Sequence, residues 1–303
     1  MIYTLTLNPS LDYVMHMDTI EYGKTNRSSH EEQFAGGKGF NVSTILHRLN
    51  IPTLALGFIA GEVGNLIASL LQAPAHLIRL ESGTSRINVK IKADKETEIN
   101  GSGPFICEEK LTELMTFLNT LTSDDYLVLA GSIPSCLPQN LYKIILDKLH
   151  NQQIQIIVDT TGQSLKEILV FHPFLIKPNL DELEDLFSTS IKSENDLKRW
   201  AHELQKLGAR NVLISLGAKG AYLVTEDKQY LYQQAAKGSL VNSVGSGDSM
   251  IAGFLCGYLQ THDYQEALLL GTACGGATAF SPDLATLKQI EDIKKSLVIA
   301  TAK

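Results

Sequence analysis

The chain has 303 residues with a formal net charge of −7, 44% hydrophobic residues and a mean hydropathy of +0.01. This composition is typical of a folded globular protein and excludes wholesale disorder. The negative charge argues against a nucleic-acid binder. No window offers the roughly 20 consecutive apolar residues that a membrane span needs.

The N-terminal residues 1–9 contain no basic residue and no long apolar stretch, so they indicate a strand rather than a signal peptide. The four cysteines include no CxxC pair, and Cys256 and Cys274 fall in apolar helical segments. We therefore expect reduced thiols and a cytoplasmic location. The histidines show no HExxH spacing, and we expect no zinc site.

Short β-branched runs alternate with helical patterns along most of the chain. The expected strands include 3–7, 54–58, 126–130, 154–159, 174–177 and 212–216, and the expected helices include 41–49, 141–151 and 197–207. Near-continuous apolar strands separated by helices predict an α/β protein whose mostly parallel sheet is covered on both faces.

One strand follows a different pattern. Over residues 86–93, Ile87, Val89 and Ile91 alternate with Arg86, Asn88, Lys90 and Lys92. Strict alternation predicts a strand with two unlike faces in a small antiparallel sheet, with a partner at 96–100. Two interpretations remain open: a solvated edge hairpin, or a lid whose basic side chains face an anionic substrate.

The C-terminal third contains two helical patterns, an apolar stripe over 250–259 and a segment at 266–280 that is crowded with glycine and alanine. Each glycine inside a helix costs up to about 1 kcal/mol relative to alanine. Close backbone packing of the two helices explains why these glycines are accepted.

A Gly245-Ser246-Gly247 turn opens the first of these helices, and Asp248 follows it directly. Free backbone N–H groups and the helix dipole make such a turn an anion site. A carboxylate beside an anion site has two interpretations. It is a general base for a hydroxyl that attacks a bound phosphoryl group, or it only complements the helix dipole. Walker A and Rossmann fingerprints are not met by the sequence.

Six motifs that follow one another in a fixed order favour the general-base interpretation of Asp248. They are LNPSLD (7–12), GGKGFNV (36–42), GSIP (131–134), KPNLDEL (177–183), SLGAKGA (215–221) and GSGDS (245–249). With them, the chain resembles the PfkB, or ribokinase-like, carbohydrate kinase family over residues 6–281, and is most similar to its hexose-phosphate branch. The resemblance implies one ribokinase-like domain, a three-layer α/β/α fold over 1–303, with an antiparallel β lid inserted at about 11–32 and 85–104.

The resemblance also implies roles for single residues. Asp248 resembles the catalytic base, and Gly245, Ser246 and Gly247 resemble the anion hole. The residues implied to bind ATP are Lys177, Asn179, Ser215, Gly217 and Gly220, and Glu182 is implied to organise Mg²⁺ through water. The residues implied to bind the substrate are Asp12, Gly37, Lys38, Asn41, Arg86, Asn88 and Arg27, with Lys38, Arg86 and Arg27 at the phosphate that the sugar already carries.

The implied activity is ATP- and Mg²⁺-dependent phosphorylation of a ketohexose monophosphate. The expected reaction converts fructose 1-phosphate to fructose 1,6-bisphosphate. The alternatives are a tagatose-6-phosphate kinase, which gives tagatose 1,6-bisphosphate, and a non-catalytic sugar-phosphate or nucleotide sensor on the same fold. The apolar face of the lid strand must be covered, so we expect a homodimer that forms through the lid. The expected partners are small molecules, with no nucleic acid and no membrane.

Overall fold

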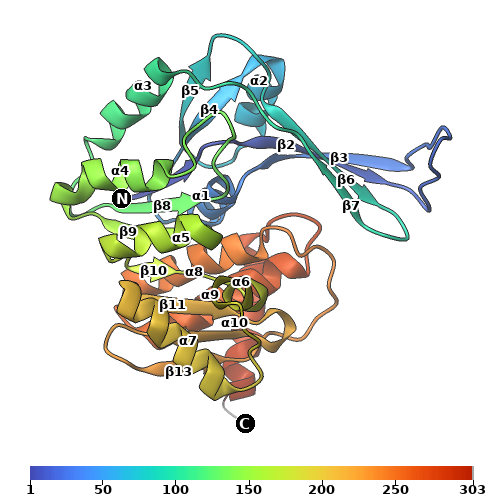
Figure 1. Cartoon of the computed structure of the whole chain (residues 1–303). Helices are drawn as coiled ribbons and strands as arrows, with labels where there is room; N and C mark the ends of the chain where they lie inside the picture. Colours follow the sequence, from blue (N-terminus) through green and yellow to red (C-terminus); the bar gives the residue numbers. More distant parts are fainter. Residues whose placement is uncertain (302–303) are drawn as a thin grey trace.

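A computed structural model describes the backbone of residues 1–301 and the side chains of residues 1–297 (Figure 1). Its body is built on a nine-stranded sheet with the order β13-β12-β11-β10-β9-β8-β1-β4-β5. These strands are β1 (Ile2–Thr6), β4 (Thr53–Ala60), β5 (Ala75–Leu80), β8 (Tyr126–Ala130), β9 (Gln155–Asp159), β10 (Leu175–Ile176), β11 (Asn211–Ser215), β12 (Ala221–Val224) and β13 (Tyr230–Gln233). All neighbours are parallel except β11–β12 and β12–β13, which confirms the predicted mostly parallel sheet.

Helices cover both faces of this sheet. One face carries α1 (Lys38–Arg48), α8 (Ser246–Thr261), α9 (Tyr264–Ala279) and α10 (Leu287–Thr301). The other carries α3 (Glu108–Leu118), α4 (Leu141–Leu149), α5 (Gly162–Ile168), α6 (Leu180–Phe187) and α7 (Glu194–Leu207). Three short 3₁₀ helices lie at His150–Gln152, Leu169–Phe171 and Gly217–Lys219, and α2 (Gly61–Leu70) packs beside β4. No helix within residues 1–301 has both the length and the apolar character to cross a membrane.

The hydrophobic core has two parts, one on each face of the sheet, because neighbouring side chains of a strand point to opposite faces. Along β8, Leu127 and Leu129 enter the core under α3–α7, whereas Val128 and Ala130 enter the core under α1, α8 and α9. This explains why the strand reads as a continuous apolar run in the sequence. It also confirms the expected three-layer α/β/α arrangement.

The glycines of α8 and α9 let the two backbones approach closely. A Cβ atom on Gly253 would lie 2.6 Å from both Leu270 O and Cys274 Sγ, and one on Gly271 would lie 2.9 Å from Met250 O. Contacts this short are essentially never made by a real Cβ atom, so a side chain at either position would separate the helices. The predicted tight packing of these two helices is therefore observed.

A second sheet, with the order β3-β2-β6-β7, projects from the body (Figure 1). Its strands are β2 (Ser10–His16), β3 (His30–Gly36), β6 (Arg86–Lys92) and β7 (Thr97–Asn100). β2–β3 and β6–β7 are antiparallel hairpins, and a parallel β2–β6 pair joins them. The parallel pair arises because the first strand of each hairpin leads away from the body. We call this sheet the lid.

The lid strand β6 has two unlike faces as the alternation predicts, but the polar residues at its centre are buried, as is Ile91 on the apolar face. Asn88 and Lys90 are 8% and 7% exposed, whereas Ile87 on the opposite face is 41% exposed. Ile99 of β7, which shares a face with Val89, is 59% exposed. This burial favours the lid interpretation of the strand over the solvated hairpin.

Candidate active site

The predicted functional residues gather at the carboxyl ends of the parallel strands, where α/β proteins commonly bind ligands. Gly245 precedes α8 with a φ of 78°, a left-handed conformation that glycine adopts without strain. A Cβ atom on Gly247 would lie 3.0 Å from Lys177 Nζ. Glycine at this position therefore lets a cation approach the first turn of α8. There Ser246 N–H donates to Ser243 O at 3.3 Å, and the next two N–H groups have no intrahelical acceptor.

Asp248 is buried in this first turn, at 5% exposure. Asn41 Nδ2, from α1, donates a hydrogen bond of 2.8 Å to Asp248 Oδ2. Burial and the nearby charge of Asp159 raise the pKa of Asp248 to about 6, although Lys38, Asn41 and Lys177 act in the opposite direction. A carboxylate with such a pKa is ionised at neutral pH and is well suited to accept a proton.

Asp159 is a site residue that the sequence analysis missed. It ends β9, is 2% exposed, and forms ion pairs with Lys38 Nζ at 3.0 Å and Lys177 Nζ at 3.2 Å. Burial alone would raise the pKa of Asp159, but Lys177 and Lys38 outweigh burial and lower it. The sequence signal that could have identified Asp159 is its position at the end of a predicted buried strand, at the same sheet edge as the recognised motifs.

Asp12 is held on the inner face of the lid by a polar network. Its carboxylate receives hydrogen bonds from Lys90 Nζ at 2.7 Å, Ser10 Oγ at 2.7 Å and Asn88 Nδ2 at 3.2 Å. The glycine turn before α1 lies close by, since a Cβ atom on Gly36 would be 2.4 Å from Asp12 Oδ1. The network fixes the direction of the carboxylate.

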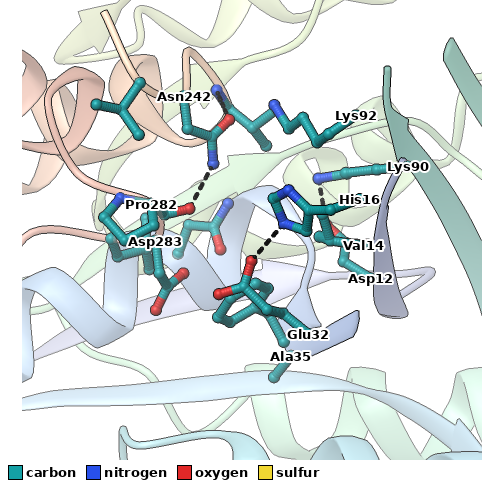
Figure 2. Close-up of a pocket in the computed structure, with 15 residues that line it drawn as sticks. Asp12, Val14, His16, Glu32, Ala35, Lys90, Lys92, Asn242, Pro282 and Asp283 are labelled. Carbon is teal, nitrogen blue, oxygen red and sulfur yellow. Dashed lines mark hydrogen bonds and ion pairs between the residues drawn. The ribbon is translucent and has the colours of Figure 1, made fainter. Parts of the chain in front are cut away.

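A cavity of about 190 Å³ opens between the lid and the loops that flank α8 and α9. Figure 2 shows Asp12, Lys90 and His16 together on one side, with Pro282 and Asp283 on the other. Asn41, the partner of Asp248, also lines this cavity. We call it the acceptor pocket. Its basic lining residues are His16, Lys90 and Lys92.

The other predicted substrate residues lie in different places. Asn88 contacts Asp12, Lys38 pairs with Asp159, and Gly37 forms the turn before α1 with a φ of 129°. Arg86 Nε donates to Asn8 O at 3.0 Å. Arg27 lies on the exposed loop between β2 and β3, at the end of the hairpin remote from the body, so within this chain it does not join the site (Figure 1).

A larger cavity of about 910 Å³ lies on the other side of the α8 turn. Among the residues expected to bind ATP, Asn179, Ser215, Gly217 and Gly220 line it, together with Ser246 and Gly247. Lys177 instead pairs with Asp159. The sequence analysis missed the far wall, which is formed by the segment 234–240 and by Thr272, Gly275, Gly276, Ala279 and Phe280. We call this the nucleotide cavity.

Asn179 and Glu182 form a reciprocal cap at the start of α6. Glu182 N donates to Asn179 Oδ1 at 2.8 Å, and Asn179 N donates to Glu182 Oε2 at 2.9 Å. Within the described part of the chain, no group of three or more His, Cys, Asp or Glu side chains is placed to hold a metal ion. Glu182 Oε1 takes no part in the cap. It is a single hard oxygen, and Mg²⁺ commonly binds to one or two such carboxylate oxygens while it keeps several of its waters.

The fold and the two cavities around a helix N-terminus define an α/β protein of the phosphotransferase kind. A family model described as "pfkB family carbohydrate kinase" matches residues 5–290. The chain is 40% identical to the 1-phosphofructokinase of Bacillus subtilis over 299 residues, and 33% identical to the D-tagatose-1-phosphate kinase of Bacillus licheniformis over 303 residues. These matches cover 97% and 99% of both chains. A solved structure of Escherichia coli phosphofructokinase-2 aligns with a TM-score of 0.92 at 25% identity, covering 98% of this chain and 99% of that one.

The chain belongs to the pfkB family of carbohydrate kinases. The resemblance inferred from the six motifs is confirmed, as is its ribokinase-like fold. It is accordingly an ATP-dependent sugar kinase.

Proposed function

We propose that this kinase transfers the γ-phosphoryl group of ATP to the C6 hydroxyl of fructose 1-phosphate and forms fructose 1,6-bisphosphate in the cytoplasm. The observation that carries the proposal is the position of Asp248 between the two cavities. Its partner Asn41 lines the acceptor pocket, and its neighbours Ser246 and Gly247 line the nucleotide cavity. The 40% identity to a 1-phosphofructokinase supports the choice of acceptor.

In this reaction Asp248 accepts the proton of the attacking hydroxyl, whose oxygen forms the new bond to the γ-phosphorus. The bond from that phosphorus to the bridging oxygen breaks, and ADP leaves. The backbone N–H group of Gly247 stabilises charge on the transferring group, and Lys177 adds positive charge nearby. Asp159 positions Lys177 and Lys38.

Asn179 and Glu182 would hold Mg²⁺ through its waters, close to the phosphates of the bound nucleotide. When bound, the metal neutralises phosphate charge. Ser215, Gly217 and Gly220 form the wall against which the nucleotide lies. On the acceptor side, Asp12 and Asn41 bind sugar hydroxyls at the turn that Gly37 makes, and Asn88 orients Asp12. Lys38 and Arg86 bind the phosphate of the acceptor.

A second acceptor has direct support from a relative, because D-tagatose-1-phosphate kinase is 33% identical to this chain. Tagatose 1-phosphate presents the same C6 hydroxyl, whereas tagatose 6-phosphate would have to attack through its C1 hydroxyl. Comparison of kcat/KM for fructose 1-phosphate, tagatose 1-phosphate, tagatose 6-phosphate and fructose 6-phosphate tests the proposal. We expect fructose 1-phosphate to give the highest value, and a higher value for another acceptor would reassign the substrate.

The role of Asp248 is tested with Asp248→Asn, which keeps the size of the side chain and its bond to Asn41. We expect kcat to fall by about 10²–10⁴-fold, the usual contribution of a general base, while calorimetry still detects ATP binding. Asp147→Asn, at an exposed position on α4, is the matched control and should keep normal kcat. Near-normal turnover by Asp248→Asn would refute the assignment.

We also propose a homodimer in which the outer faces of two lids cover each other. Ile87 and Ile99 lie exposed on this face, and a folded sheet with an uncovered apolar face is unfavourable in water. We further propose that in such a dimer the β2–β3 loop, which carries Arg27, reaches the partner's acceptor pocket. Arg27 would then contact the acceptor phosphate of the other subunit.

A further inference from the structure

The loop 282–285, which connects α9 to α10, forms one wall of the acceptor pocket. Pro282, Asp283 and Leu284 line the cavity on the side opposite Asp12 (Figure 2). Asn242 Nδ2 donates to Pro282 O at 3.0 Å, which joins this loop to the segment that precedes the α8 turn. The reaction proposed above gives this wall no role.

Arg48, the last residue of α1, holds the loop in place. Its Nη1 donates to the carbonyl oxygens of Leu284 and, at 2.9 Å, Ala285. Its Nε and Nη2 donate to Gln72 Oε1 at 3.1 and 2.9 Å. The guanidinium therefore directs its donors at carbonyl and amide oxygens. Because α1 also carries Lys38 and Asn41 in its first turn, one helix fixes both the reaction centre and the opposite wall.

The Asp283 carboxylate is left with little direct compensation. Its only ion pair within residues 1–297 is to Arg48 Nη2 at 3.9 Å, beyond hydrogen-bond distance. The side chain is 37% exposed and borders the cavity. Burial raises the pKa of Asp283, Leu284 N–H and Arg48 lower it, and across the pocket Glu32 raises it while Lys90 lowers it. Asp283 thus faces the lid residues and keeps free acceptor capacity.

We propose that Asp283 is a specificity-determining residue, whose carboxylate accepts a hydrogen bond from a ketohexose hydroxyl on the wall opposite Asp12. This inference rests on the proposed function, since it assigns a further contact to the same acceptor. A carboxylate suits a hydroxyl donor and repels a phosphate. With Glu32 close by, the Asp283 wall directs the phosphate of the acceptor away from itself and so helps to select which end of the sugar faces Asp248.

Asp283→Ala and Asp283→Asn, with Asp147→Ala as the matched exposed control, test this role. For Asp283→Ala we expect KM for fructose 1-phosphate to rise about 10–100-fold, the range for a hydrogen bond to a charged group. KM for ATP should stay within about twofold, because the nucleotide lies in the other cavity. Asp283→Asn, which keeps one acceptor oxygen, should show a smaller rise. An unchanged KM for the sugar phosphate in both variants overturns the proposal.

Deoxy analogues separate a direct contact from a structural role. Wild type and Asp283→Ala are compared on analogues of fructose 1-phosphate that lack the C3 or the C4 hydroxyl. We expect the penalty of Asp283→Ala to disappear on one analogue and to persist on the other, because a contact that is already missing cannot be lost again. An equal penalty on both, or a large rise in the KM for ATP, would show that the variant only disturbs the loop.

The proposed function and this inference fail in different ways. Lack of turnover of every sugar phosphate by wild type would refute the proposed function. Calorimetric binding of fructose 1-phosphate to wild type and Asp283→Ala would still test the contact. If wild type prefers another sugar phosphate, the same variants are measured on that substrate with its own deoxy analogues.

Discussion

The ionised carboxylate of Asp248 destabilises the folded protein. Its pKa in the folded protein, about 6, lies above the ordinary value of 3.8 because burial and Asp159 disfavour the ionised form. The folded state therefore holds this proton more tightly than the unfolded chain does. Ionisation of Asp248 therefore lowers the free energy of unfolding as pH rises through the interval from about 4 to 6. Protonation removes this penalty below that interval.

We therefore expect Asp248→Asn to have a higher Tm than wild type at pH 7.5, by a few degrees, and the difference to shrink towards zero as pH falls below 4. Calorimetry of both proteins across this pH range measures it. The kcat/KM of wild type, which reports the free enzyme, should fall on the acid side with an apparent pKa close to 6. A Tm for the variant at or below that of wild type at pH 7.5 would contradict this account.

Lys90 and Lys92 lie on the same strand face but in different environments. Lys90 pairs with buried Asp12, whereas Lys92 pairs with Glu96 on the exposed end of the hairpin. We expect Lys90→Met to lower the free energy of unfolding by about 3–5 kcal/mol, because it leaves a buried carboxylate without its counter-charge. Lys92→Met, the matched control, should cost less than about 1 kcal/mol. Urea unfolding measures both, and equal losses would argue against a special role for the buried pair.

At the scale of elements, the α8–α9 pair positions the anion turn. Gly253 and Gly276 both lie inside these helices, but a Cβ atom on Gly253 would meet atoms at 2.6 Å, whereas one on Gly276 would meet its nearest atom at 3.5 Å. We expect Gly253→Ala to destabilise the protein by about 1–3 kcal/mol through overpacking. Gly276→Ala should be neutral or stabilising by up to about 1 kcal/mol, from helix propensity.

Thermal unfolding of the two alanine variants tests this contrast. Equal Tm values would mean that the helices can separate without cost, and that the glycines are not needed for their packing. Because Ser246 starts α8, and a Cβ atom on Gly275 of α9 would lie 3.1 Å from Ser246 O, separation of the helices should also lower kcat in Gly253→Ala.

At the scale of the whole molecule, the proposed dimer gives the lid one face for the substrate and one for a partner. Ile99→Asp places a charge on the outer face and should convert the dimer to a monomer at micromolar concentration. Val170→Asp is the matched control, since Val170 is a similarly exposed apolar residue at 62%, on the body. Light scattering measures both masses. A monomeric wild type, or a dimeric Ile99→Asp, would contradict assembly through the lid.

Local patterns in the sequence predicted much of this molecule. Apolar runs identified β8 and β9, and the alternation at 86–93 identified a strand with two unlike faces. Alternation separates two faces but does not say which one meets water, so the burial of Lys90 emerged only from the fold. Asp159 and Asp283 were missed because their partners are distant in sequence: Lys38 and Lys177 for the first, Arg48 for the second. A lone carboxylate has no spacing that marks it as functional.

The parallel β2–β6 pair has a consequence for the order of folding. Asp12 and Asn88 hydrogen-bond although they are 76 positions apart, and β1, α1, β4, α2 and β5 are completed by residues that flank or separate the two hairpins. Closing so long a loop carries an entropic cost that the intervening body must first reduce. We expect the lid amides to gain hydrogen-exchange protection after those of β1 and β4, and the reverse order would contradict this. Since the lid supplies one wall of the acceptor pocket, a newly made chain should complete this pocket, and with it the choice of sugar phosphate, only after β1 and β4 have paired.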